Sequence, residues 1–313
     1  MLTRRRVIAA KIESVEGTAE AITSADGGIL VISPKIDYDF GMNEREVTVD
    51  TLSKLQPVPG KTSGKLSFRA ELKGAGVAYS SSIQPALGKY LKACGFAETI
   101  DATADSESVT YDPASTGIPC LTMWSYEDGV IKKLKGCRGN VKFSGKNGEI
   151  CFADFEFTGV YDGVVDGAII SPTFEATVPP VLLSSAFTIG TYSANINSFD
   201  LDMANEVTLR ESIGTASGYV SALITDRGPT GKIDPEMVTV ATYDFFGKWK
   251  AGTPAAMSLG SVGATQYNRF TLTAPQVITS KIADEERAKL MVAGLSFSLA
   301  MDTGDDEVSI VFD

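Results

Sequence analysis

Apolar and polar residues alternate along many short stretches of this chain, and this period of two is typical of half-buried β-strands. In residues 66–72 every second residue from Leu66 to Leu72 is apolar, and the residues between them are polar or charged. Residues 151–158 repeat the pattern, with cysteine, alanine and two phenylalanines on one face. We therefore expect one face of such strands in a core and the other against water or a partner.

Turn signals join many of these stretches into hairpins. Glu127-Asp128-Gly129 and Lys146-Asn147-Gly148 each separate two β-rich runs, as in hairpin turns. Further strands are expected over 29–40 and, near the C-terminus, in the runs LSFSLAM and VSIVFD. The acidic residues Asp302, Asp305, Asp306 and Glu307 lie between those two runs. Their spacing does not fit a calcium loop, so we interpret them as a hairpin turn.

Two segments have the three-to-four residue period of an amphipathic helix. The first runs from a cap at Ser81 or Ser82 to Gly95, with an apolar stripe that includes Leu87 and Tyr90. The second is a short helix around 243–251. The predicted fold is therefore mainly β with minor α, with a helix packed on each of two β-barrels or sandwiches.

The two-domain expectation comes from an internal repeat. Glu46-Val47-Thr48-Val49 precedes Gly64-Lys65-Leu66, and Glu206-Val207-Thr208-Leu209 precedes Gly231-Lys232-Ile233, at offsets of 160 and 167 residues. The helical segments LGKYLKACG and FGKWKAG also match, as do Phe155 and Phe157 with Leu295 and Phe297. Matches in the same order indicate duplication. A Gly- and Pro-rich stretch places the boundary near residue 175, giving domains 1–175 and 176–313.

Composition is that of a folded globular protein and excludes several kinds of active site. The 313 residues suffice for two cores, and 43% are hydrophobic. The chain has no histidine, which removes Ser-His and Cys-His catalysis. The four cysteines have no CxxC spacing, and GKTSGK lacks the spacing of a phosphate-binding loop. We therefore expect no enzymatic activity, no metal and no cofactor.

The remaining candidate features have structural explanations. The tryptophans Trp124 and Trp249 are expected in the core, and the acidic run 284–286 is expected in a solvated loop. After the basic cluster Arg4 to Arg6, the apolar run is too short for a signal peptide or a membrane span. A net charge of −11 disfavours tight DNA binding, although an acidic surface suits a path along which DNA slides.

The order of these segments resembles that of the major tail tube proteins of long-tailed (siphophage-type) bacteriophages. The matching segments are residues 9–31, the strand-helix-strand order over 63–163, and the second half from NEVTLRES to DTGDDEVSIVF, 205–312. The resemblance implies a structural virion protein of the tail, assembled in the host cytoplasm. Its subunits would join their inner sheets into stacked rings that form the tail tube.

The resemblance also implies partners. Rings of six domains would need three duplicated chains, with pseudo-sixfold symmetry. Tape-measure, tail terminator and tip proteins would contact the tube, and double-stranded DNA would cross the lumen transiently, without sequence specificity. The lumen surface is expected to be acidic or neutral, and no membrane is involved.

Contacts between rings are expected at the long connections 41–63 and 210–231 and at the N-terminal arm. Deleting residues 1–12 should then abolish polymerisation and leave the monomer folded. The candidate assembly residues are Arg4, Arg5, Arg6, Glu46, Thr48, Lys65, Glu206, Thr208, Arg210 and Lys232.

Three alternatives remain open at this point. A secreted or cell-surface carbohydrate-binding β-sandwich would need a secretion signal or exposed aromatic residues. The tube of a contractile injection system shares the general fold but is typically single-domain. An enzyme would need a converging group of polar residues, which the sequence does not show.

Overall fold

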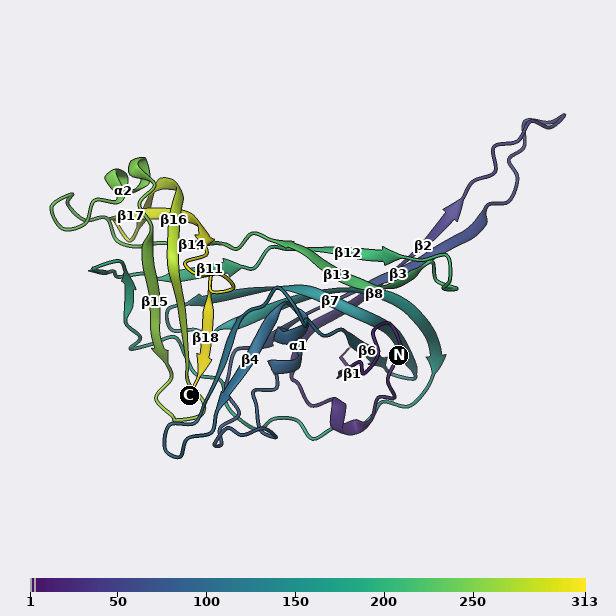
Figure 1. Cartoon of the computed structure of the whole chain (residues 1–313), viewed down its shortest axis with the longest axis horizontal. Coiled ribbons are helices and arrows are strands. Elements are labelled where there is room, and N and C mark those ends of the chain that lie inside the picture. Colours follow the sequence, from purple (N-terminus) through teal and green to yellow (C-terminus); the bar gives the residue numbers. More distant parts are fainter. Residues whose placement is uncertain (1, 3) are drawn as a thin grey trace.

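The computed structural model describes residue 2 and residues 4–313, and it confirms a mainly β fold (Figure 1). Within this part of the chain there are two short α-helices and one 3-10 helix, η1. The elements are β1 (Arg6–Ile12), η1 (Ser24–Asp26), β2 (Val31–Asn43), β3 (Val58–Glu71), α1 (Gly88–Ala93), β4 (Phe96–Asp101), β5 (Ser108–Pro113), β6 (Leu121–Glu127), β7 (Val130–Lys146), β8 (Phe152–Asp166), β9 (Phe187–Ile189), β10 (Tyr192–Ser193), β11 (Ser198–Asp202), β12 (Asn205–Glu211), β13 (Tyr219–Arg227), β14 (Thr230–Ile233), α2 (Phe245–Ala251), β15 (Ala255–Val262), β16 (Phe270–Arg287), β17 (Leu290–Ala300) and β18 (Ser309–Phe312).

One antiparallel sheet runs through both halves of the chain, with the strand order β16-β17-β14-β11-β7-β8-β3-β2. The order contains two four-stranded groups. In the group β7-β8-β3-β2, the hairpin β7–β8 pairs through β8 with β3 of the earlier hairpin β2–β3. In the group β16-β17-β14-β11, the hairpin β16–β17 pairs in the same way through β17 with β14, which lies beside β11. The groups join edge to edge, because β11 pairs with the end of β7 and sets Phe199 opposite Gly145 and Leu201 opposite Phe143. The whole fold is sandwich-like, and among the described residues it does not close into a barrel.

The apolar faces of these strands form the core, as the alternation predicts. Phe155 and Phe157 on β8 and Phe68 on β3 are at most 3% exposed. Tyr90 of α1 packs edge-on against Phe68, with ring centroids 5.3 Å apart. Burial of large side chains of this kind contributes roughly 1.5–3 kcal/mol each. The helix therefore closes the core on the side away from the polar face of the sheet.

The two halves share contacts besides the β11–β7 junction. The C-terminal strand β18 pairs with β16 on one side and with β5 of the first half on the other. Residues 167–186 contain no named strand, which agrees with a connecting segment, and one buried cluster extends over both halves. The domain boundary near residue 175 stays a prediction.

The N-terminal segment is a strand of the fold. β1 pairs with β6, and residues 8–10 are fully buried. Deleting residues 1–12 would remove this buried strand, so the expectation that the monomer would stay folded is wrong. Met1 and Thr3 lie outside the described residues.

The first helix is shorter than its sequence pattern predicts. α1 begins at Gly88 rather than near Ser82, and no side chain caps it. Ser80 and Ile83 instead exchange backbone hydrogen bonds, and the Gln84 side chain donates to the carbonyls of Ser80 and Ser81. These local bonds compete with the first helical turn. Leu87 and the rest of the stripe are buried, but Ile83 is exposed.

Several loop and core expectations are also corrected. Residues 210–231 are mostly not a loop, because β12 and β13 form a separate two-stranded hairpin. The acidic segment 302–307 is not a hairpin turn, because β17 and β18 both pair with β16 and follow each other along it. Residues 284–286 lie in β16 opposite β17 rather than in a loop. Trp249 is 38% exposed, so it is not a core residue.

Candidate assembly interface

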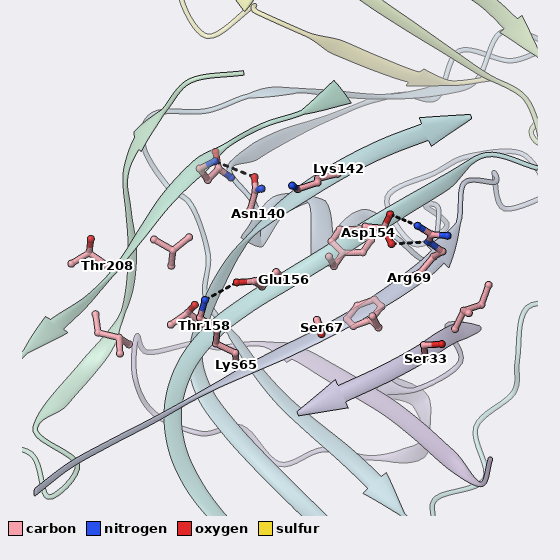
Figure 2. Close-up of a pocket in the computed structure, with 16 residues that line it drawn as sticks. Ser33, Lys65, Ser67, Arg69, Asn140, Lys142, Asp154, Glu156, Thr158 and Thr208 are labelled. Atoms are coloured by element: carbon pink, nitrogen blue, oxygen red, sulfur yellow. Dashed lines mark hydrogen bonds and ion pairs between the residues drawn. The ribbon is translucent and has the colours of Figure 1, made fainter. Parts of the chain in front are cut away.

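One face of the main sheet is lined by polar side chains, which project from every second position of its strands. Figure 2 shows this face on the first half, where two ion pairs cross between β3 and β8: Arg69 to Asp154 at 2.7 Å and Lys65 to Glu156 at 2.7 Å. Arg69 lies directly opposite Asp154, and Lys65 is displaced by two positions along the strands from Glu156. Such exposed pairs contribute little to stability, at most about 1 kcal/mol each.

The polar face continues across the junction into the second half. Lys142 of β7 contacts Asp202 of β11 at 2.8 Å, and Asp200 lies opposite Lys232 of β14. Lys232 in turn lies opposite Ser296 of β17. Charges of both signs therefore alternate over the eight strands. The face has neither a strongly basic patch that would hold a polyanion nor an apolar patch that would bind a partner tightly.

Asp202 secures the junction between the two groups of strands. Burial alone would raise the pKa of Asp202, but hydrogen bonds from Lys142, Asn140 and the backbone amide of Ala204 outweigh it and hold the pKa below its ordinary value. The ionised carboxylate is therefore favoured in the folded chain.

We expect Asp202→Asn to reduce the acid sensitivity of folding. Because the folded pKa is depressed, the wild-type carboxylate contributes stability above the unfolded pKa and loses it as pH falls through the folded pKa. The variant should be about 1 kcal/mol less stable at pH 7. Urea unfolding at pH 7 and at pH 3 measures both effects. If the free energies of unfolding of the wild type and the variant differ as much at pH 3 as at pH 7, this role of Asp202 is contradicted.

The β12–β13 hairpin of the second half lies on the first half of the same chain. Arg138, a residue of β7 that is 7% exposed, donates to the carbonyls of Ala222 on β13 and of Ile118. Asn205 donates its side-chain amide to the carbonyl of Gly139 at 3.0 Å. At the far end the amide of Thr62 donates to the carbonyl of Ser217 at 3.0 Å. The hairpin is thus fastened at both ends to strands β7 and β3.

The matching segment of the first half has no such support. Residues 44–57, which we call the arm, form no strand, and every one of them is exposed. The arm continues the β2–β3 hairpin and projects away from the rest of the molecule (Figure 1). It carries exposed apolar side chains, among them Val47 at 53% and Leu52 at 105%. An extended, apolar and unsupported segment is typical of an interaction surface.

The sequence-predicted assembly residues lie in four separate places. Arg4 is exposed, Arg5 pairs with Asp128 at 2.8 Å, and Arg6 donates to the carbonyl of Pro34. Glu46 and Thr48 lie in the arm.

The other predicted residues belong to the polar face and to the β12–β13 hairpin. Lys65 and Lys232 occupy equivalent positions on the polar face, in β3 and β14. Glu206, Thr208 and Arg210 lie on β12, where Arg210 approaches Glu16 at 3.8 Å. Of the two segments that carry the repeat, the β12–β13 hairpin is packed on the first half of the chain, and the arm is not.

Arg138 and Asp202 were missed by sequence reasoning, although both are central to the contact between the halves. Neither belongs to a motif, and each is one of many charged residues in β-rich stretches. Only the pairing of β7 with β11 and the crossing of β13 over β7 give them their roles. The polar position of Asp202 in an alternating strand was the one signal available.

Other kinds of site find no support among residues 2 and 4–313. No group of three His, Cys, Asp or Glu side chains in this part of the chain is arranged to hold a metal ion. No described helix is long and apolar enough to cross a bilayer. The four cysteines are buried and unpaired.

The comparison with protein families agrees with the features of the sheet. A family model described as phage tail tube protein matches residues 3–302, nearly the whole chain. No match was found among curated proteins. This family is structural, and the chain is therefore a structural protein of the phage tail. The chain belongs to the phage tail tube protein family.

Proposed function

We propose that this protein polymerises into stacked rings that form the tail tube, through which DNA passes during ejection. The observation that supports the proposal most is the β11–β7 junction, where one four-stranded group adds its edge to another. The same edge-to-edge pairing of strands is possible between chains, because antiparallel strand addition uses only main-chain hydrogen bonds and matching side-chain faces.

The ends of the eight-strand order leave edges for such addition. On the described chain, β2 pairs only with β3, and β16 beyond Val277 pairs only with β17. Unpaired main-chain groups at a sheet edge favour association with another strand. A ring satisfies all of these groups at once, since a closed set of subunits leaves no edge.

We further propose that the two four-stranded groups are copies of one domain, with domains 1–175 and 176–313. Their strand orders are the same, and the repeated Gly-Lys segments occupy equivalent strands β3 and β14. A ring of six such groups then contains three chains and has pseudo-sixfold symmetry.

In this ring the polar face of the sheet lines the lumen. Its mixed charges, close to neutral in sum, suit DNA that must slide without sticking. The arm is placed to contact the next ring in the stack, and the tape-measure, tail terminator and tip proteins are the proposed further partners. Assembly is proposed to take place in the host cytoplasm.

The mass of the assembled ring tests this proposal. Three chains of 33.1 kDa give a ring of about 99 kDa, and six give about 199 kDa. We expect native mass spectrometry of the smallest assembled species to give the three-chain mass, and negative-stain images to show rings or tubes. A six-chain ring would contradict the pseudo-sixfold arrangement, and monomers alone at high concentration would contradict polymerisation.

A further inference from the structure

We propose that an aromatic cluster of one copy of this chain packs against helix α2 of a second copy. The cluster consists of Tyr38, Phe40 and Tyr161, and the helix presents Phe246 and Trp249. The inference rests on the proposed ring, and it names the apolar side chains that join neighbouring copies.

The outer strands β2 and β11 correspond residue by residue. In both, an apolar-Asp-apolar segment pairs with the Gly-Lys-apolar segment of the adjacent strand: 36–38 with 64–66, and 199–201 with 231–233. Tyr38 therefore corresponds to Leu201, and the next apolar residue, Phe40, corresponds to Met203.

The apolar side chains of β11 are covered by the first half, whereas those of β2 have no such cover. Leu201 lies opposite Phe143 of β7 and is 2% exposed. Met203 is fully buried, and its backbone amide donates to the carbonyl of Val141 at 3.1 Å. Phe40 is 46% exposed, because no strand of the described chain pairs with the outer edge of β2. The internal junction therefore buries the counterpart of a side chain that β2 leaves exposed.

The aromatic cluster is already ordered in the single chain. Tyr38 and Phe40 stack with ring centroids 5.8 Å apart, and Tyr161 of β8 packs edge-on against each of them at 5.0 Å. Edge-to-face and offset-stacked rings are favourable arrangements. Aromatic side chains with few rotatable bonds also lose little conformational entropy on binding, so the cluster suits a protein interface.

Helix α2 exposes the side chains whose counterparts are buried on α1. In the matching segments LGKY and FGKW, Leu87 corresponds to Phe246 and Tyr90 to Trp249. Leu87 and Tyr90 are 2% and 0% exposed, whereas Phe246 and Trp249 are 47% and 38% exposed. α2 is anchored instead through the neighbouring Phe245, which is 4% exposed. Exposed large apolar side chains that gather on one helix are typical of an interaction site.

α2 lies beside the free edge of β16. Within the chain α1 contacts β7, and α2 contacts β16, the corresponding strand of the second group. Just beyond α2, Ala255 of β15 lies opposite Val277, after which β16 pairs only with β17. At the internal junction Asn205, soon after β11, donates its side-chain amide to the carbonyl of Cys94 at the end of α1. Addition of β2 to the edge of β16 therefore brings the aromatic cluster to α2.

Chemical cross-linking tests the contact. Met42→Cys lies two residues beyond Phe40, Lys250→Cys lies next to Trp249, both positions are exposed, and the native cysteines are buried. β2 and α2 lie at opposite ends of the molecule (Figure 1), so the two thiols cannot be linked within one chain. We expect the double variant, treated with a short bismaleimide, to give cross-linked oligomers that stop at three chains.

The single-cysteine variants are the matched controls. Neither Met42→Cys nor Lys250→Cys alone should cross-link, because the contact joins two different surfaces. An equal mixture of the two should give dimers and nothing larger, because each chain then carries one accessible thiol. Dimers from either single variant alone would overturn the contact.

Removal of the exposed rings tests how much the contact contributes to assembly. We expect Phe40→Ser and Phe246→Ser each to leave a cooperatively folded monomer and to raise the concentration needed for assembly by roughly tenfold to a hundredfold. Val178→Ser removes an apolar side chain that is 76% exposed in the connecting segment, and it should assemble like wild type. Light scattering measures assembly. Equal effects of the three variants, or none from Phe40→Ser and Phe246→Ser, would overturn the proposal.

Electron microscopy of the cross-linking samples separates this contact from the proposed function. Rings formed by the double variant without cross-links would overturn the contact and leave the tube function intact. Absence of rings in the wild-type protein would overturn both.

Discussion

Replacing residues 44–57 by a two-residue Asn-Gly turn should leave a folded monomer that no longer forms tubes. The last residue pair of the β2–β3 hairpin is Asn43 opposite Val58, so a two-residue turn can join these strands directly. The arm is exposed throughout, and its removal takes away no buried contact of the monomer. The shorter loop should stabilise the chain by up to about 1.7 kcal/mol through loop entropy.

Electron microscopy and thermal unfolding together measure this result. The matched control shortens the corresponding connection of the second half by replacing residues 206–226 of the β12–β13 hairpin. That change removes the contacts of Ala222 and Ser217 with the first half and should lower the melting temperature. Tubes of normal length from the variant that lacks residues 44–57 would refute a role for the arm in stacking.

Arg138→Met should destabilise the monomer by about 3 kcal/mol, because its guanidinium satisfies two main-chain carbonyls inside the contact between the halves. Methionine fills a similar volume but donates no hydrogen bond, so the carbonyls of Ile118 and Ala222 lose their partner. Glu16 also loses its neighbour at 3.4 Å and keeps only Ser221 and the more distant Arg210.

Urea denaturation followed by circular dichroism gives the free energy of unfolding. Arg138→Lys is the conservative control, and it should recover part of the loss, because an ammonium group reaches one of the carbonyls but not both. A loss below about 0.5 kcal/mol for Arg138→Met would mean that the hairpin is held by its apolar contacts alone, since substitutions without structural consequence fall in that range.

Strand identity and side-chain orientation could be predicted from the sequence because they depend on local alternation. The predicted core face of residues 151–158 is buried, and the predicted hairpin turns at 127–129 and 146–148 join β6 to β7 and β7 to β8. The family could also be recognised, because the order of short segments survives when each segment is weakly specific. The N-terminal basic cluster, by contrast, suggested a free N-terminal segment, although the apolar residues after it form a buried strand.

Alternation does not specify which strand lies beside which. A period of two determines which side chains face the core, but many strand partners satisfy the same pattern, and the choice depends on contacts between residues far apart in the chain. The sequence by itself therefore determined the mainly β class, the polar and apolar faces and the family. Only the tertiary structure decided that β11 joins β7, that Arg138 holds the β12–β13 hairpin, and that the matching arm has no partner within the described chain.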